Sequence, residues 1–169
     1  MDYNEMKGLT VEEFVARCEE FGFKKEIEQH SGKEQYVLTD KDALFMKMLR
    51  QVILDHGDKP FKEYEECDER DFFGHHTYTV EVYISRIQVN KVVVDTDGYD
   101  GAPYFFFDYL YWTCDCDGEE RERHGGTHAD AEMDADFNKM TGEEFKKQTI
   151  GEFLDLFEET VREDIRYWE

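Results

Sequence analysis

The 169 residues include 42 Asp and Glu but only 20 Lys and Arg, which gives a formal net charge of −22 at pH 7. Hydrophobic residues make up 40% of the chain and aromatic residues 15%, which supplies a packed core and argues against intrinsic disorder. Nucleic acid phosphates and anionic membrane surfaces repel such a charge, whereas basic proteins attract it. The length suits one domain, so we expect residues 1–169 to form a single acidic domain.

The first third of the chain predicts a helix followed by a β-hairpin. Thr10-Val11-Glu12-Glu13 has the pattern of a capping box, and the apolar spacing that follows is helical until Gly22, which can end the helix. Residues 23–29 and 33–39 are typical of two short strands joined around Ser31-Gly32.

A second helix is expected after Asp40, with an apolar stripe over residues 44–52 and an end at Gly57. Residues 58–75 are mixed and acidic, and they favour neither a helix nor a strand clearly. Residues 76–86 alternate in hydrophobicity, and residues 87–94 continue as a strand after a turn or bulge.

Asp95-Thr96-Asp97-Gly98 has turn chemistry, and residues 104–114 then form the strongest predicted strand. Residues 119–140 hold a Gly-Gly pair without a clear period, so we expect a flexible or loop excursion there. Thr141-Gly142-Glu143-Glu144 is a second capping-box pattern, and a closing helix follows over residues 153–168.

This order of elements predicts an α+β fold with a single domain. Its antiparallel sheet would consist of a hairpin plus a three-strand meander, with about three helices packed on one face. The acidic start lacks the pattern of a signal peptide, no apolar run approaches a membrane span, and four cysteines do not resemble a disulfide framework. We therefore expect a cytoplasmic protein.

The sequence contains no catalytic signature, so we expect a non-enzymatic protein without a cofactor. His75-His76 has no nucleophile at a recognisable spacing, and Gly125-Gly126 precedes no Lys-Ser/Thr of a phosphate-binding loop. Because 42 carboxylates are present, the proximity of any two of them has no specificity.

A weak metal candidate combines Cys114 and Cys116 with His124 and His128. The histidine spacing is common in structural zinc sites, but the cysteine spacing is shorter than usual and the interval between the pairs is tight. We expect no bound metal, with reduced cysteines and surface histidines as the ordinary interpretation. The alternative function is a small zinc metalloprotein or enzyme that uses these four residues.

The negative charge is concentrated in one region. Residues 92–138 contain thirteen Asp or Glu and two Arg, which leaves −11, and the other 122 residues also sum to −11. Aromatic residues of the strand 104–112 lie within this region, and they either fill a central strand or form an interface surface. The partner-binding residues that we expect here are Asp95, Asp97, Asp100, Tyr104, Asp108, Asp115, Asp117, Glu119 and Glu120.

In size, charge and these acidic and aromatic segments, the chain resembles phage-encoded inhibitors of bacterial defence, namely DNA mimics and acidic anti-CRISPR proteins. It is also similar in style to acidic immunity proteins that block nuclease toxins. The resemblance implies an inhibitor that binds the basic nucleic-acid-binding surface of a nuclease or CRISPR effector, without direct contact with nucleic acid or membrane. A solvated acidic face, or an acidic interaction domain of a larger assembly, is the alternative.

Overall fold

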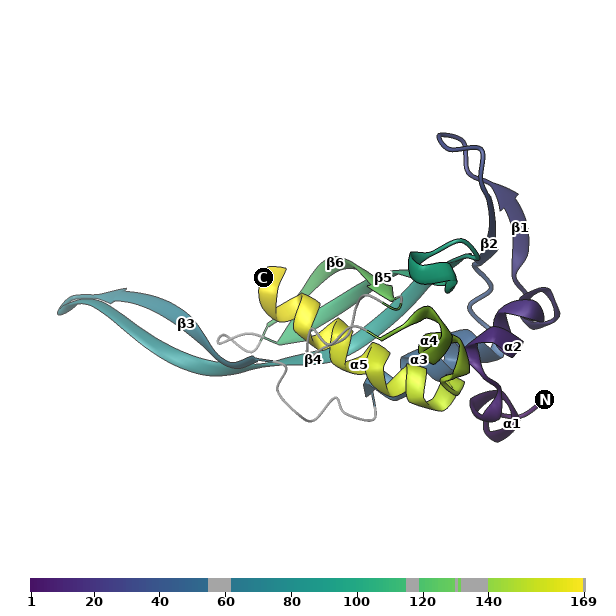
Figure 1. Cartoon of the computed structure of the whole chain (residues 1–169). Coiled ribbons are helices and arrows are strands. Elements are labelled where there is room, and N and C mark those ends of the chain that lie inside the picture. Colours follow the sequence, from purple (N-terminus) through teal and green to yellow (C-terminus); the bar gives the residue numbers. More distant parts are fainter. Residues whose placement is uncertain (55–61, 115–118, 130, 132–139, 169) are drawn as a thin grey trace.

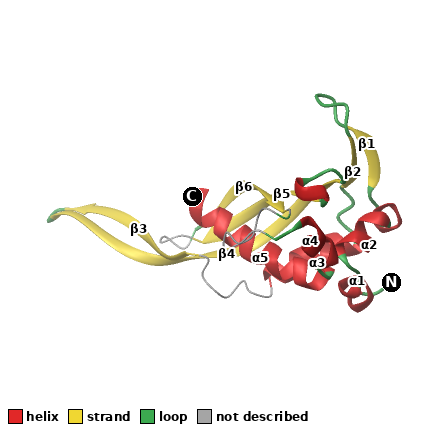
Figure 2. Cartoon of the chain, viewed as in Figure 1, coloured by secondary structure: helices red, strands yellow, loops and turns green. Residues whose placement is uncertain are grey.

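A computed structural model describes residues 1–54, 62–114, 119–129, 131 and 140–168. The chain forms an antiparallel sheet in the order β1-β2-β4-β5-β6, with β3 paired to β4, and helices cover one face of the sheet (Figure 1, Figure 2). This arrangement confirms the predicted α+β class with an antiparallel sheet. None of the helices in the described part of the chain has the length and apolarity that crossing a membrane requires.

The predicted N-terminal capping box forms as expected. The side chain of Thr10 accepts a hydrogen bond from the backbone N–H of Glu13 and so starts α2 (Val11–Ala16). A 3-10 turn, η1 (Cys18–Phe21), extends the helix, and Gly22 ends it with φ 99°, a conformation that favours glycine. The preceding helix α1 (Tyr3–Gly8) was not predicted, because six residues hold too few apolar positions to show a period.

The next two predictions are also confirmed. Strands β1 (Lys24–Ile27) and β2 (Glu34–Leu38) pair as an antiparallel hairpin. Helix α3 (Leu44–Leu54) follows and contributes Phe45, Met46, Met48 and Leu49 to the core. Gly57, which was expected to end this helix, lies outside the described residues.

Strand β4 (Gly74–Asp95) is a single strand of 22 residues, where the sequence predicted two strand segments joined by a turn or bulge. The expected interruption is present only as two shifts in register against β5, between Ile84 and Arg86 and between Val89 and Lys91, so the strand bends without turning back. Its first half pairs with β3 (Lys62–Asp71), which lies within the stretch left unassigned from sequence. Residues 62–82, called the arm below, project beyond the body of the protein (Figure 1).

Strand β5 (Tyr104–Cys114) has the predicted bounds. The stretch 119–140, which was expected to be a flexible or loop excursion, contains a further strand. Residues 120–129 of that stretch form β6 (Glu120–Ala129), paired with β5 along its whole length. The strand escaped detection because it lies at the sheet edge, where charged residues and two glycines remove the usual alternation of hydrophobicity. Residues 130 and 132–139 lie outside the described part.

The closing segment forms two helices where one was predicted, α4 (Gly142–Lys147) and α5 (Ile150–Trp168). Thr141 accepts a hydrogen bond from the N–H of Glu144 at the start of α4, and Thr149 accepts one from Glu152 at the start of α5. Rings from both helices meet alternate residues of β5: Phe105 contacts Phe145 and Phe153, and Phe107 contacts Phe153 and Phe157. The core therefore lies between this inner face of the sheet and the helices.

Candidate interaction surface

The two faces of β5 differ in burial. The odd-numbered residues from Phe105 to Thr113 are buried on the inner face, against the helices. The even-numbered residues are half-buried on the opposite face, called the outer face below: they are Tyr104, Phe106, Asp108, Leu110, Trp112 and Cys114. Of the two interpretations of this aromatic strand, the described residues therefore support partial exposure of one face.

An imidazole lies against two aromatic rings at one end of the outer face. His128 of β6 is opposite Phe106 of β5, and its ring centroid lies 5.0 Å from that of Phe106 and 5.4 Å from that of Tyr104. His128 itself is exposed. These rings form a partly accessible aromatic surface that can contact another molecule.

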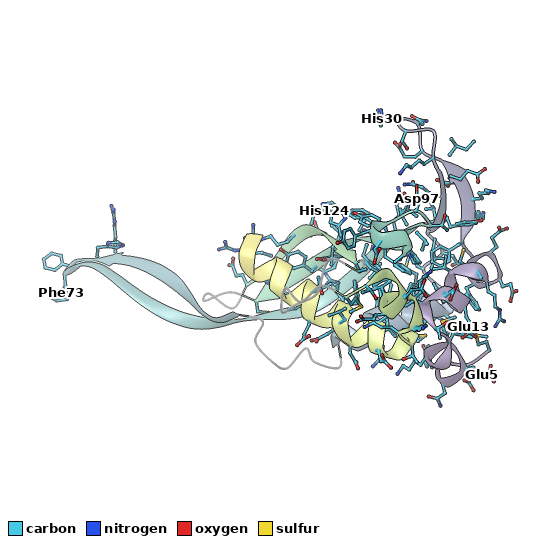
Figure 3. All side chains as sticks on the ribbon, in the orientation of Figure 1. Glu5, Glu13, His30, Phe73, Asp97 and His124 are labelled. Carbon is cyan, nitrogen blue, oxygen red and sulfur yellow. The ribbon has the colours of Figure 1, made fainter. Side chains whose placement is uncertain are left out.

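The next position along the outer face carries a contact between an imidazole and a carboxylate. The Nε2 atom of His124 lies 2.6 Å from Oδ1 of Asp108, whose direct partner on β6 is Gly126. A Cβ atom on Gly126 would lie 3.1 Å from the ring of Phe106, so the glycine leaves room for that ring. Figure 3 shows His124 and Asp97 on the same side of the molecule, away from the tip of the arm.

Two basic residues of β4 lie on the outer face, and neither was among the residues expected there from the sequence. The guanidinium carbon of Arg86 lies 3.9 Å from the ring centroid of Trp112, a cation–π contact, and Lys91 is opposite Asp108. Arg86 and Lys91 are 26 and 17 positions before their partners in sequence, and bulges set the register, so only the fold brings them together. The outer face therefore carries both signs of charge.

The acids at the start of β5 have different environments. Asp95 accepts a hydrogen bond from the N–H of Asp97 at 2.9 Å, as expected for the predicted turn. The exposed carboxylate of Asp97 lies 3.9 Å from the ammonium group of Lys33. Tyr104 is the direct partner of Asp95 on β5.

Asp100 has a structural role. Its backbone has φ 54°, and its carboxylate accepts a hydrogen bond of 2.8 Å from the N–H of Gly142 at the start of α4. A Cβ atom on Gly142 would collide with the carbonyl group of Asp100, so the close approach needs glycine. This carboxylate is therefore engaged in a hydrogen bond within the chain.

Glu119 and Glu120, two more of the expected acids, lie at the far end of β5. Glu119 and Glu120 are exposed, and Glu120 is opposite Cys114, whereas Asp115 and Asp117 lie outside the described residues. The eleven residues of β5 span roughly 33 Å at about 3.3 Å per residue, so the acids form two separated groups. The outer face of β5 connects these groups.

The register also separates the described members of the metal candidate. Cys114 is opposite Glu120, whereas His124 is opposite Leu110 and His128 is opposite Phe106. These partners lie four and eight positions from Cys114 along β5, which corresponds to roughly 13 and 26 Å. Cys116 lies outside the described residues, and within the described ones no group of three His, Cys, Asp or Glu could hold a metal ion.

No family model, curated protein or solved structure matches the chain. The function therefore has to be inferred from the surface itself. That surface consists of the outer face of β5 with its neighbours on β4 and β6, and of exposed acids at both ends of the strand.

Proposed function

We propose that this protein is a non-enzymatic inhibitor that binds the basic nucleic-acid-binding surface of another protein, in the manner of anti-CRISPR proteins and nucleic acid mimics. The target class is a nuclease or CRISPR effector. The observation that carries the proposal is the placement of exposed acids at both ends of a half-buried aromatic strand, in a chain of net charge −22.

Acids at such positions can occupy places where a nucleic acid presents phosphates. Asp97 is exposed at one end of the outer face, and Glu119 and Glu120 are exposed at the other. A basic groove that binds a polyanion attracts both groups at once, and this attraction increases the rate of encounter.

The rings between the two acidic groups would supply short-range contacts. Tyr104, Phe106 and Trp112 are half-buried and therefore keep part of their surface available. Aromatic anchors of this kind mainly slow dissociation, whereas charge mainly speeds association. Arg86 and Lys91, which lie opposite Trp112 and Asp108, would help to set the register of the partner.

Displacement of nucleic acid from its binding protein tests the proposal. Fluorescently labelled duplex or guide RNA is bound to each member of a panel of CRISPR effectors and nucleases, and the protein is added at increasing concentration. We expect release of the labelled nucleic acid from at least one member, with no binding of the protein to the nucleic acid alone. Failure to displace it from any panel member, or a direct mobility shift, contradicts the proposal.

A further inference from the structure

The tip of the arm exposes two adjacent aromatic side chains. Phe72 and Phe73 form the turn between β3 and β4, and they are 96% and 86% exposed. Their rings meet edge to face, with centroids 5.6 Å apart. Figure 3 shows Phe73 at the extreme end of the arm, far from the labelled residues of the body.

The geometry of the turn does not require phenylalanine. Asp71 pairs with Gly74 across the turn, and Gly74 takes the positive φ, at 126°. Phe72 and Phe73 both have φ outside the positive range, because Asp100 is the sole non-glycine residue with positive φ in the described part of the chain. Polar residues that are common in turns would fit these two positions equally well.

The exposed rings also form a substantial apolar surface. Two phenylalanine side chains expose roughly 300 Å² or more, which is comparable to the largest apolar patch of many soluble proteins, and such patches are often functional. The described part of β3 pairs with β4 alone, so the tip is held away from the core. The apolar pair is therefore displayed to the surroundings.

The charge of the arm indicates which class of partner it can bind. Residues 62–82 contain seven Asp or Glu and two Lys or Arg. Phosphate surfaces, whether of nucleic acids or anionic lipids, repel such an arm, whereas a protein surface rich in Lys and Arg attracts it. An apolar pocket with basic residues around it complements both the rings and the charge that flanks them.

We propose that the arm is an anchoring element whose Phe72–Phe73 tip inserts into an apolar pocket, bordered by Lys and Arg, on the partner protein. The inference rests on the proposed function, because the pocket belongs to the same basic target. The two rings fill the pocket as hot-spot residues, and the net negative charge of residues 62–82 complements its basic border. The arm thus gives the protein a second contact, separate from the outer face of the sheet.

The test compares a tip variant with a matched control on the full chain. The tip variant carries Phe72→Ser and Phe73→Ser, and the control carries Ile27→Ser, which removes another exposed apolar side chain, 69% exposed, on β1. Calorimetry measures affinity for the effector or nuclease from which the wild-type protein displaces nucleic acid. We expect a roughly thirtyfold or greater loss of affinity in the tip variant, as for hot-spot residues, and less than a threefold change in the control.

A conservative variant and circular dichroism complete the comparison. Phe72→Leu with Phe73→Leu keeps apolar side chains and should retain most of the affinity, and all variants should keep the wild-type far-ultraviolet spectrum. If the tip variant binds the target as tightly as the wild type, the anchoring proposal fails while the proposed function stands. If the wild type binds no member of the panel, both fail.

Two further measurements test other binding partners of the tip. Flotation with phosphatidylcholine vesicles tests a membrane, and sedimentation velocity at increasing concentration tests a second copy of the chain. The inference would be overturned if the wild type bound vesicles or self-associated, and if the tip variant lost this property but kept its affinity for the target. The tip would then bind a membrane or a second copy of the chain. The expected result is that neither occurs.

Discussion

The hydroxyl groups of Tyr109 and Thr127 lie 2.8 Å apart in the interior of the protein, one on β5 and the other on β6. The ring of Tyr109 reaches this position by passing over Gly125, where an added Cβ atom would lie 2.6 Å from the ring. The Gly-Gly pair of β6 therefore serves packing on both faces of the sheet: Gly125 accommodates Tyr109 on the inner face, and Gly126 accommodates Phe106 on the outer face.

We predict that Gly125→Ala destabilises the protein by about 1–3 kcal/mol, the usual cost of an overpacked core. Urea unfolding followed by circular dichroism measures the change. Gly8→Ala is the control, because an added Cβ at Gly8 meets no atom within 4 Å, and its effect should stay within about 0.5 kcal/mol. Equal stability of Gly125→Ala and the wild type would contradict the packing of Tyr109 described above.

Glu28 should titrate well below an ordinary glutamate. Hydrogen bonds from the Ser31 side chain and from the N–H groups of His30 and Ser31 lower the pKa of Glu28 from 4.5 to about 2. Because the folded pKa is the lower one, its contribution to stability is complete above pH 4.5 and is lost as the pH falls towards 2. An NMR titration of the Glu28 carboxyl carbon should have its midpoint near 2 in the wild type and closer to 4.5 in Ser31→Ala.

Cys18 should resist alkylation in the folded protein. Burial, assisted by the negative charge of Glu19, raises the pKa of Cys18 from 9.0 to about 11, and the side chain is 2% exposed. Its folded pKa exceeds the unfolded one, so this thiol favours folding fully below pH 9 and progressively less as the pH rises towards 11. Peptide mass spectrometry after iodoacetamide treatment at pH 8 should find Cys114, which is half-buried, modified before Cys18. Rapid native labelling of Cys18 would contradict its burial.

Charge reversal should distinguish the effect of the acids at the ends of β5 on the association rate from the effect of total net charge. Changing Asp97, Glu119 and Glu120 to Lys should slow association with the basic target, and this effect should diminish as salt rises. The control changes Glu152, Asp155 and Glu159 of α5 to Lys, which alters net charge equally at exposed positions. Stopped-flow association rates at several salt concentrations provide the comparison. Equal slowing by both sets would mean that only total charge matters.

The elements predicted correctly are those whose signals are local. Thr10 and Glu13 form their capping box within four residues, and β5 is visible directly in its sequence as a run of aromatic residues that favour strands. Gly22 ends its helix segment as expected, since only one residue has to adopt positive φ there.

Two strands were missed because their sequences show no clear hydrophobic period. Strand β3 has six Asp or Glu among its ten residues, and its sequence shows no hydrophobic alternation; it pairs with β4 outside the body of the protein. Strand β6 carries Arg and Glu along an exposed edge, where only Thr127 and Ala129 are buried. In both cases backbone pairing with a stronger strand determines the structure, and that pairing is not local in sequence.

The candidate surface was predictable in composition but not in arrangement. The acids were identified from their density, yet the engagement of Asp100 with Gly142 depends on residues 42 positions apart. The contact of Arg86 with Trp112 depends on the register between β4 and β5, which two bulges shift. Exposed Phe72 and Phe73 could have been noticed in sequence as apolar residues at a turn before glycine, but the turn itself was not recognised.

If both proposed contacts form, the continuity of β4 makes the protein bivalent. The same strand ends at the arm tip with Gly74 and contributes Arg86 to the outer face, so the two contacts are joined by roughly 40 Å of paired backbone. When one of the two surfaces has bound the partner, β4 holds the other surface close to its own binding site on that partner. The effective concentration of the second surface at this site is then high. Two individually weak contacts would then combine into a long-lived complex, and partners whose two binding surfaces have a different spacing would be rejected.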